Sequence, residues 1–302
     1  MSTKISSPFS KNAGKGQEAQ KHVDAVLKEI EERNATVEGQ TNWRSEAYQR
    51  FMIKDLASID EGDYAGYARY LDNGAVYIVV HPAYYTFFHD DSLLPEYSPG
   101  ISADNAMERF LSESAYSSKS RLIKAQEKQI RDFLEYMSTD KKLVILVLPR
   151  DYRDFPAYKF RKDRDEYMRF INEVTNGSDS VVYLYSKRPN RGTLAEKDLR
   201  SLLRFLYAVK TNQILLGGGY LGRCIEDFYK DIERYYSSEK VYLVPEITAI
   251  SPNDISSGTA SNMLKPDGTI NVEALSASIR GNAVGNQEIV PRIRNISPHK
   301  IR

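Results

Sequence analysis

The sequence predicts a three-layer α/β/α fold built on a parallel sheet of about five to six strands. Five short apolar runs show little polar alternation, which is typical of strands buried on both faces of a sheet. Segments of helical periodicity separate these runs, and strands that alternate with helices form parallel sheets covered on both sides. The runs span residues 75–80, 143–148, 181–185, 214–216 and 241–244.

The predicted helices lie between these runs. In the clearest of them, Leu199, Leu202, Leu203 and Leu206 recur with the spacing of one helix face. Ligands of such folds bind at the carboxyl ends of the strands, so functional residues are expected there. The predicted helices span residues 104–137, 165–174, 196–209 and 224–236.

Composition divides the chain into three parts. Residues 1–63 are predicted to form an N-terminal arm, flexible at first and then helical over residues 23–30 and 43–56. Residues 64–252 carry the α/β pattern. Residues 253–302 are polar and lack aromatic side chains, which predicts an irregular, extended tail. Scattered aliphatic residues suggest that this tail lies along another surface, so we expect a homo-oligomer joined through its terminal arms.

Charge and cysteine content exclude several classes of protein. The net charge is +1 and basic residues are interspersed with acidic ones, so a nucleic-acid surface is not expected. A single cysteine permits no intrachain disulfide, and the polar N-terminus has no apolar segment of a signal peptide. Since no apolar run approaches the ~20 residues needed to span a membrane, we expect a soluble, cytoplasmic protein.

Cys224 follows the fourth apolar run through a glycine-rich turn that contains Gly218, Gly219 and Gly222. Helical periodicity begins immediately afterwards, which places Cys224 on the first turn of a helix. The N-terminus of a helix favours an anion, so the pKa of the thiol is predicted to fall below the ~8.5 of a free cysteine. The alternative is that Cys224 is simply a small buried apolar side chain.

Two other strand ends supply polar residues that could join Cys224. His81 follows the first run and Lys187 follows the third. Alternatively, Lys187 is a solvated loop residue and His81 only ends its strand before a proline. The aromatic residues after the first run are predicted to form an apolar wall above Cys224, or else to pack under the N-terminal helices. They are Tyr84, Tyr85, Phe87, Phe88 and Tyr97.

Residues 181–251 resemble the second half of the isochorismatase-like cysteine hydrolases, a superfamily that includes nicotinamidases and isochorismatases. In the family pattern a lysine follows a strand, a Thr-x-Leu-like segment starts the next helix, and glycine precedes the nucleophilic cysteine with five residues between them. Lys187, Thr193, Leu194, Gly218 and Cys224 stand at these positions.

The resemblance implies hydrolysis of an amide or related carbon–nitrogen bond in a small molecule, with no cofactor. Cys224 would attack the carbonyl carbon, and the oxyanion would be held by Lys187 and by N–H groups of the turn. The turn residues are Gly218, Gly219, Gly222 and Arg223. No metal is expected, because the candidate ligands lack the spacing of the family's metal ligands; they are Asp151, Asp154, His81, His89 and Asp90.

The sequence departs from the family pattern at the end of the first strand. Family members carry a catalytic aspartate there, whereas this chain has Val80 and His81. His81 would restore a base if its pKa were near ~6.5. The alternative is a catalytically degenerate relative that binds a ligand or builds an assembly.

A further interpretation concerns the same glycines. Gly217, Gly219 and Gly222 match the spacing of a dinucleotide-binding fingerprint, and Glu246 stands near the end of the next strand, where a ribose-binding acid would lie. A dinucleotide-binding α/β protein is therefore the third alternative.

Overall fold

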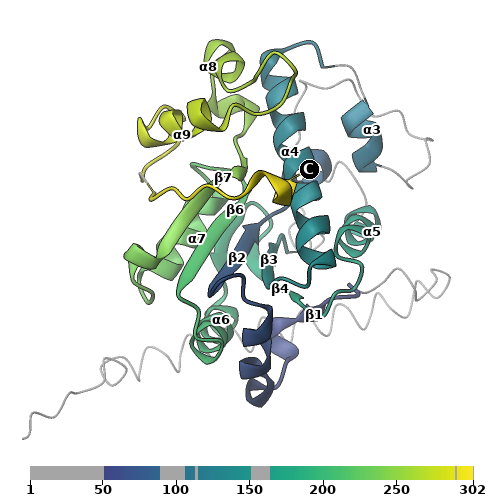
Figure 1. Cartoon of the computed structure of the whole chain (residues 1–302), viewed down its shortest axis with the longest axis vertical. Helices are drawn as coiled ribbons and strands as arrows, with labels where there is room; N and C mark the ends of the chain where they lie inside the picture. Colours follow the sequence, from purple (N-terminus) through teal and green to yellow (C-terminus); the bar gives the residue numbers. More distant parts are fainter. Residues whose placement is uncertain (1–50, 89–105, 113–114, 151–163, 290, 302) are drawn as a thin grey trace, which may run out of the picture. The chain divides into compact units, whose positions relative to one another are not determined.

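A mostly parallel sheet organises the protein in a computed structural model that describes residues 51–88, 106–112, 115–150, 164–289 and 291–301 (Figure 1). The strand order is β1-β4-β3-β2-β6-β7, and β5 pairs with β4 in the antiparallel direction. The strands are β1 (Lys54–Asp55), β2 (Ala75–Val80), β3 (Val144–Leu148), β4 (Val181–Arg188), β5 (Arg191–Leu194), β6 (Gln213–Gly219) and β7 (Val241–Ala249).

Each of the five predicted apolar runs forms a strand, and the three-layer architecture is confirmed. Successive side chains of a strand point to opposite faces, so Val80 joins one apolar cluster and Val79 the other. Helices α4 (Ser118–Thr139) and α5 (Arg164–Thr175) cover one face of the sheet. Helices α6 (Glu196–Ala208) and α7 (Cys224–Glu233) cover the other (Figure 1).

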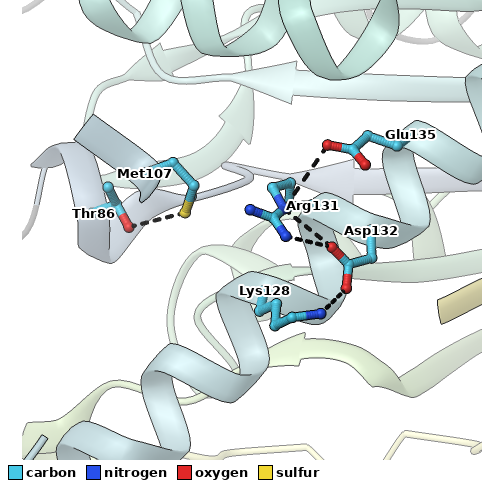
Figure 2. Close-up of polar contacts among 6 residues, drawn as sticks. All are labelled: Thr86, Met107, Lys128, Arg131, Asp132 and Glu135. Carbon is cyan, nitrogen blue, oxygen red and sulfur yellow. Dashed lines mark hydrogen bonds and ion pairs between the residues drawn. The ribbon is translucent and has the colours of Figure 1, made fainter. Parts of the chain in front are cut away.

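Helix α4 has one apolar and one charged side. Phe133 is fully buried against the sheet, whereas Lys128 and Arg131 both form ion pairs with Asp132 (Figure 2). Short helices complete this face: α2 (Tyr84–Phe88) and α3 (Ala106–Ser112), which meet where Thr86 Oγ1 lies 3.8 Å from Met107 Sδ (Figure 2). The described 3-10 helices are η3 (Leu56–Ser58), η4 (Glu61–Tyr70), η7 (Ser238–Lys240), η8 (Pro252–Asp254) and η9 (Pro298–Ile301).

The domain begins earlier than residue 64. The helix predicted over residues 43–56 is wrong in its described part, because Lys54–Asp55 is the edge strand β1 and pairs in parallel with Val182 and Tyr183. Asp55 then caps η3 by accepting a hydrogen bond from Ala57 N at 2.9 Å. The helix predicted over residues 23–30 lies outside the described residues.

The C-terminal segment is not an irregular, extended tail. It contains α8 (Ser257–Asn262) and α9 (Val272–Arg280), and Met263, Leu275 and Ile279 are fully buried in the same apolar cluster as α6 and α7. Further along, Leu243 N donates to Arg292 O at 2.7 Å and Arg294 N donates to Leu243 O at 2.9 Å. The segment therefore packs on its own domain, beside the edge strand β7. Exchange of arms in a homo-oligomer stays a prediction.

The strand order reverses between β2 and β6. The chain runs outward from β2 to β3 and β4, then crosses back to β6 on the other side of β2. In doubly wound sheets, ligands bind beyond the carboxyl ends of the strands at such a switch point. Here those ends carry His81, directly after β2, and the turn that leads from Gly219 to Cys224.

Gly218 allows β6 to approach β2 closely at this point. Its φ angle is 108°, and a Cβ built on it would lie 1.8 Å from Val80 O. Gly219 differs: a Cβ there would lie 3.6 Å from Tyr84 Cβ and 3.7 Å from Ala249 Cβ, which are ordinary contacts.

We expect Gly218→Ala to lower the free energy of unfolding by more than about 3 kcal/mol, because the added Cβ overlaps a strand carbonyl and the backbone conformation is unfavourable. Gly219→Ala is the matched control and should change it by less than about 1 kcal/mol. Urea denaturation followed by circular dichroism measures both values. Equal losses in the two variants would contradict this account of the glycine run.

Candidate functional site

His81 lies at the carboxyl end of β2 in a left-handed backbone conformation, with a φ angle of 45°. Its N–H donates to Val147 O of β3 at 2.8 Å, which fixes the residue to the sheet. A left-handed residue other than glycine is uncommon and is found more often at functional sites. The imidazole is fully buried, and its Nε2 lies 3.0 Å from Ser186 Oγ of β4.

The hydrogen bonds of Ser186 determine which imidazole nitrogen carries the proton. Ser186 Oγ donates its single hydrogen to Arg188 O at 2.8 Å, so it accepts from His81 Nε2–H. Nδ1 of the neutral ring is then an acceptor. Among the residues that the structure describes, no donor reaches this buried Nδ1. Buried polar atoms are nearly always paired in proteins, so this atom needs an explanation.

Burial also decides the protonation state of His81. Desolvation lowers the pKa of the imidazole to about 3, so the ring is neutral at physiological pH. The expectation that His81 provides a base with a pKa near neutrality is therefore wrong. The imidazole acts here as an uncharged hydrogen-bonding group.

Aromatic side chains surround the imidazole. Tyr84 stacks on His81 with ring centroids 5.4 Å apart, and Tyr220 meets Tyr84 edge-on at 5.4 Å. Burial raises the pKa of Tyr220 well above its usual value, and the nearby Glu127 carboxylate adds to this. Tyr84 contacts the imidazole directly, whereas Phe88 packs between Tyr84 at 5.4 Å and Tyr167 of α5 at 4.7 Å.

Tyr85 packs on α3: its ring centroid lies 5.6 Å from that of Phe110. That Tyr84, Tyr85 and Phe88 together form the wall of a pocket stays a prediction. Tyr97 lies outside the described residues.

Cys224 is the first residue of α7, as the sequence predicts, but its pKa is not depressed. Its side chain is only 3% exposed, and burial raises the pKa of the thiol to about 12. Asp227 raises it further, while a backbone hydrogen bond from Tyr220 and the charges of Arg223 and Arg191 oppose the increase. The prediction of a low pKa is wrong because desolvation outweighs the effect of the helix N-terminus.

Of the predicted oxyanion residues, Lys187 is exposed and Arg223 is held by an acidic residue of the C-terminal segment. Lys187 lies at the end of β4. Burial raises the pKa of Asp231, and the charge of Lys187 acts on this pKa in the opposite direction. Arg223 forms two hydrogen bonds with Asp254, from Nε to Oδ2 at 2.6 Å and from Nη2 to Oδ1 at 2.7 Å. The Arg223 backbone N–H donates to Tyr220 O at 3.2 Å. These contacts fold the C-terminal segment onto the turn.

The two residues that match the family's Thr-x-Leu-like segment lie in a strand. Thr193 and Leu194 end β5, and α6 begins at Glu196. Strand β5 packs on the start of α7, since a Cβ built on Gly192 would lie 1.7 Å from Cys224 O. This close contact contributes to the burial of Cys224.

Two glycines of the dinucleotide fingerprint pack closely against the protein. A Cβ on Gly217 would meet Ile247 at 2.6 Å, and one on Gly222 would meet the backbone of Asn286 at 2.8 Å. These two glycines are therefore required by the packing of the fold, and a dinucleotide site stays a prediction. Glu246 accepts hydrogen bonds from Asn295 Nδ2 at 2.9 Å and Ile296 N at 3.2 Å, so it holds the C-terminal segment.

Sequence reasoning missed two adjacent residues of α4. Glu127 is buried and accepts hydrogen bonds from Tyr85 N at 2.6 Å and Thr86 N at 3.0 Å, at the start of α2. Gln126 is fully buried, and its Oε1 accepts from Ile250 N, directly after β7, at 3.1 Å. The signal for Gln126 was present in the sequence, because it stands at helical spacing in an apolar stripe with Ile123 and Ile130.

Comparisons with known proteins supply no relative for this architecture. No protein-family model matches the chain. Neither a curated protein nor a solved structure matches it. The fold and the site therefore define the class of protein here: a doubly wound α/β protein with a neutral histidine at its switch point.

The described part of the chain shows neither a membrane-spanning helix nor a cluster of metal ligands. Within it, no helix has the length and apolar character needed to cross a membrane. His, Cys, Asp and Glu side chains do not gather there in any group of three or more that could hold a metal ion. Of the residues considered as metal ligands from the sequence, His89, Asp90, Asp151 and Asp154 lie outside the described residues.

We expect Cys224 of the native protein to resist alkylation by iodoacetamide at pH 8, because the thiol is buried and protonated. In urea the same residue should react completely within minutes. Mass spectrometry measures the two rates, and the Cys224→Ser variant gives the background. A native rate within tenfold of the unfolded rate would show that the thiol is accessible and reactive.

We expect acid to destabilise the protein through His81. The folded-state pKa of about 3 lies below the ordinary histidine value of about 6.5, so the unfolded state binds more protons between these values and stability falls as pH falls through this window. The free energy of unfolding falls by at most about 1.4 kcal/mol per pH unit for one bound proton.

Urea denaturation between pH 7 and pH 4 should show a steeper loss in the wild type than in His81→Gln. The control is His299→Gln, at an exposed histidine of η9, which should keep the wild-type slope. If the free energy of unfolding changed with pH in the same way in all three proteins, the lowered pKa of His81 would be refuted.

Proposed function

We propose that this protein binds a small molecule at the carboxyl ends of β2 and β6, as a divergent isochorismatase-like protein in which Cys224 is not a nucleophile. The observation that carries the proposal is His81 Nδ1, a fully buried acceptor with no partner in the described part of the chain. An unpaired buried polar atom costs ~1–3 kcal/mol. A ligand N–H or O–H that reaches Nδ1 recovers this cost.

The position of the imidazole supports binding at this place. His81 follows β2, and the neighbouring strand β6 leads into the turn before Cys224, so the two ends meet at the switch point of the sheet. Cys224 follows β6, the strand that pairs with β2, through a short turn. This placement also supports the family resemblance.

The protonation states of Cys224 and His81 favour binding over nucleophilic catalysis. Burial raises the pKa of the thiol and lowers the pKa of the imidazole, so transfer of the thiol proton to the imidazole is unfavourable. Lys187, which would hold the oxyanion, is exposed at the end of β4. Hydrolysis at Cys224 is therefore not expected, and the measurement of ammonia release described below tests it.

The surroundings of His81 indicate the chemistry of the ligand. Tyr84 and Tyr220 offer aromatic surfaces, and the neutral imidazole offers one acceptor, so an uncharged molecule with an N–H group and an apolar body matches the site. Tyr84 covers the imidazole, and its side chain must move when the ligand enters. Benzamide is a suitable probe, because it combines an amide N–H with an aromatic ring.

We expect benzamide to raise the melting temperature of the full-length protein by about 3–6 °C at ten times its dissociation constant. Benzoate has the same ring but no N–H donor, so it should give no shift. His81→Phe keeps an aromatic ring without the acceptor and should abolish the benzamide shift, which differential scanning fluorimetry measures.

Equal shifts with benzamide and benzoate, or none with either, would contradict the proposal. Ammonia release from benzamide is measured in parallel. Release that is lost in Cys224→Ser would instead support hydrolysis.

A further inference from the structure

Gln126 is a second buried polar residue with an unpaired atom. Its Oε1 accepts from Ile250 N at 3.1 Å, which fixes the orientation of the amide and leaves Nε2 as the opposite end. Nε2 is buried and has no acceptor among the described residues. A buried N–H₂ group without an acceptor costs as much as an unpaired imidazole nitrogen.

Helix α4 places Gln126 at the same edge of the sheet as His81. Adjacent to Gln126, Glu127 binds the backbone of Tyr85 and Thr86 in α2, which directly follows the His81 turn. Gln126 itself binds Ile250, which directly follows β7. The two successive residues of α4 therefore connect the ends of β2 and β7, the strands on either side of β6.

Gly219 lies between these two ends. A Cβ built on it would lie 3.7 Å from His81 O and 3.7 Å from Ala249 Cβ, so the backbones that carry His81 and Ile250 flank the end of β6. Two strand spacings of ~4.8 Å separate β2 from β7. A molecule that contacts both the His81 and the Gln126 side chains has to span this separation, and it enters only when Tyr84, which covers the imidazole, moves.

We infer that Gln126 is a specificity-determining residue of this site: its Nε2–H donates to an acceptor of the same molecule whose N–H donates to His81 Nδ1. This inference rests on the proposed function. It adds a second requirement, an acceptor that the ligand presents to Gln126. A molecule with donors alone leaves the Gln126 N–H₂ group unpaired, and a site built around a buried polar group discriminates strongly against such an analogue.

Three probes of one shape separate the two requirements. Benzamide has both a donor and an acceptor, benzoate has acceptors only, and benzamidine has donors only. The wild type should bind benzamide and reject both analogues. Isothermal titration calorimetry on the full-length protein measures the three affinities.

Gln126→Glu is the most informative variant. A glutamate oxygen still accepts from Ile250 N, but the donor is replaced by an acceptor of almost identical shape. We expect benzamide affinity to fall at least tenfold and benzamidine to bind, because the new carboxylate accepts from the amidinium. Gln213→Glu, the same change at the first residue of β6 and thus at the opposite edge of the sheet, should bind like the wild type.

The outcomes distinguish this inference from the proposed function. If His81→Phe loses benzamide while Gln126→Glu retains wild-type affinity, the role of Gln126 is refuted and the binding site stands. If the wild type does not bind benzamide, both fail. Should Gln126→Glu not fold, as judged by circular dichroism, Gln126→Met removes the donor without adding charge. Wild-type affinity in that variant would likewise refute the inference.

Discussion

The close approach of β6 to β2 at Gly218 is the constraint on which the rest of the structure depends. Because Val80 pairs with Gly218 at the ends of both strands, His81 and the Gly219–Cys224 turn leave the sheet side by side. A larger residue at Gly218 would separate them. The same glycine run lets β7 pack Ile247 against Gly217, so the three central strands end in one tightly filled edge.

Tight filling at this edge decides the chemistry of its polar groups. A helix N-terminus stabilises an anion by ~0.3–1 kcal/mol, rarely more than ~2. Burial opposes this effect at Cys224 more strongly, since it raises the pKa of the thiol to about 12. The same dry environment keeps His81 uncharged. Neutral groups that recognise a ligand by hydrogen bonding suit such an edge better than charged groups that must exchange protons.

Local pattern was sufficient for the main strands, because continuous apolar runs such as residues 75–80 require burial on both sides. It missed β1, whose two residues, Lys54 and Asp55, carry no apolar signal, and it missed the packing of Met263 and Leu275, which stand in a polar segment. At the site, the sequence placed Cys224 at the start of a helix. It could not predict the burial of the thiol, which depends on β5 and other distant elements. The register of β4 against β5 also shifts between Ser186 and Arg188, around Lys187, and no local pattern predicts this irregularity.

His81 Nδ1 and Gln126 Nε2 have opposite polarity, one an acceptor and the other a donor. If these two atoms lay within hydrogen-bond distance, each would satisfy the other, and neither would be unpaired. They are fully buried and yet both unpaired within the described chain, so they lie farther apart than one hydrogen bond. Each unpaired buried atom lowers the free energy of unfolding, and an apolar residue at position 126 would remove one of the two penalties. The proposed ligand, which carries both a donor and an acceptor, would pair both atoms and so account for a polar residue in the apolar stripe of α4.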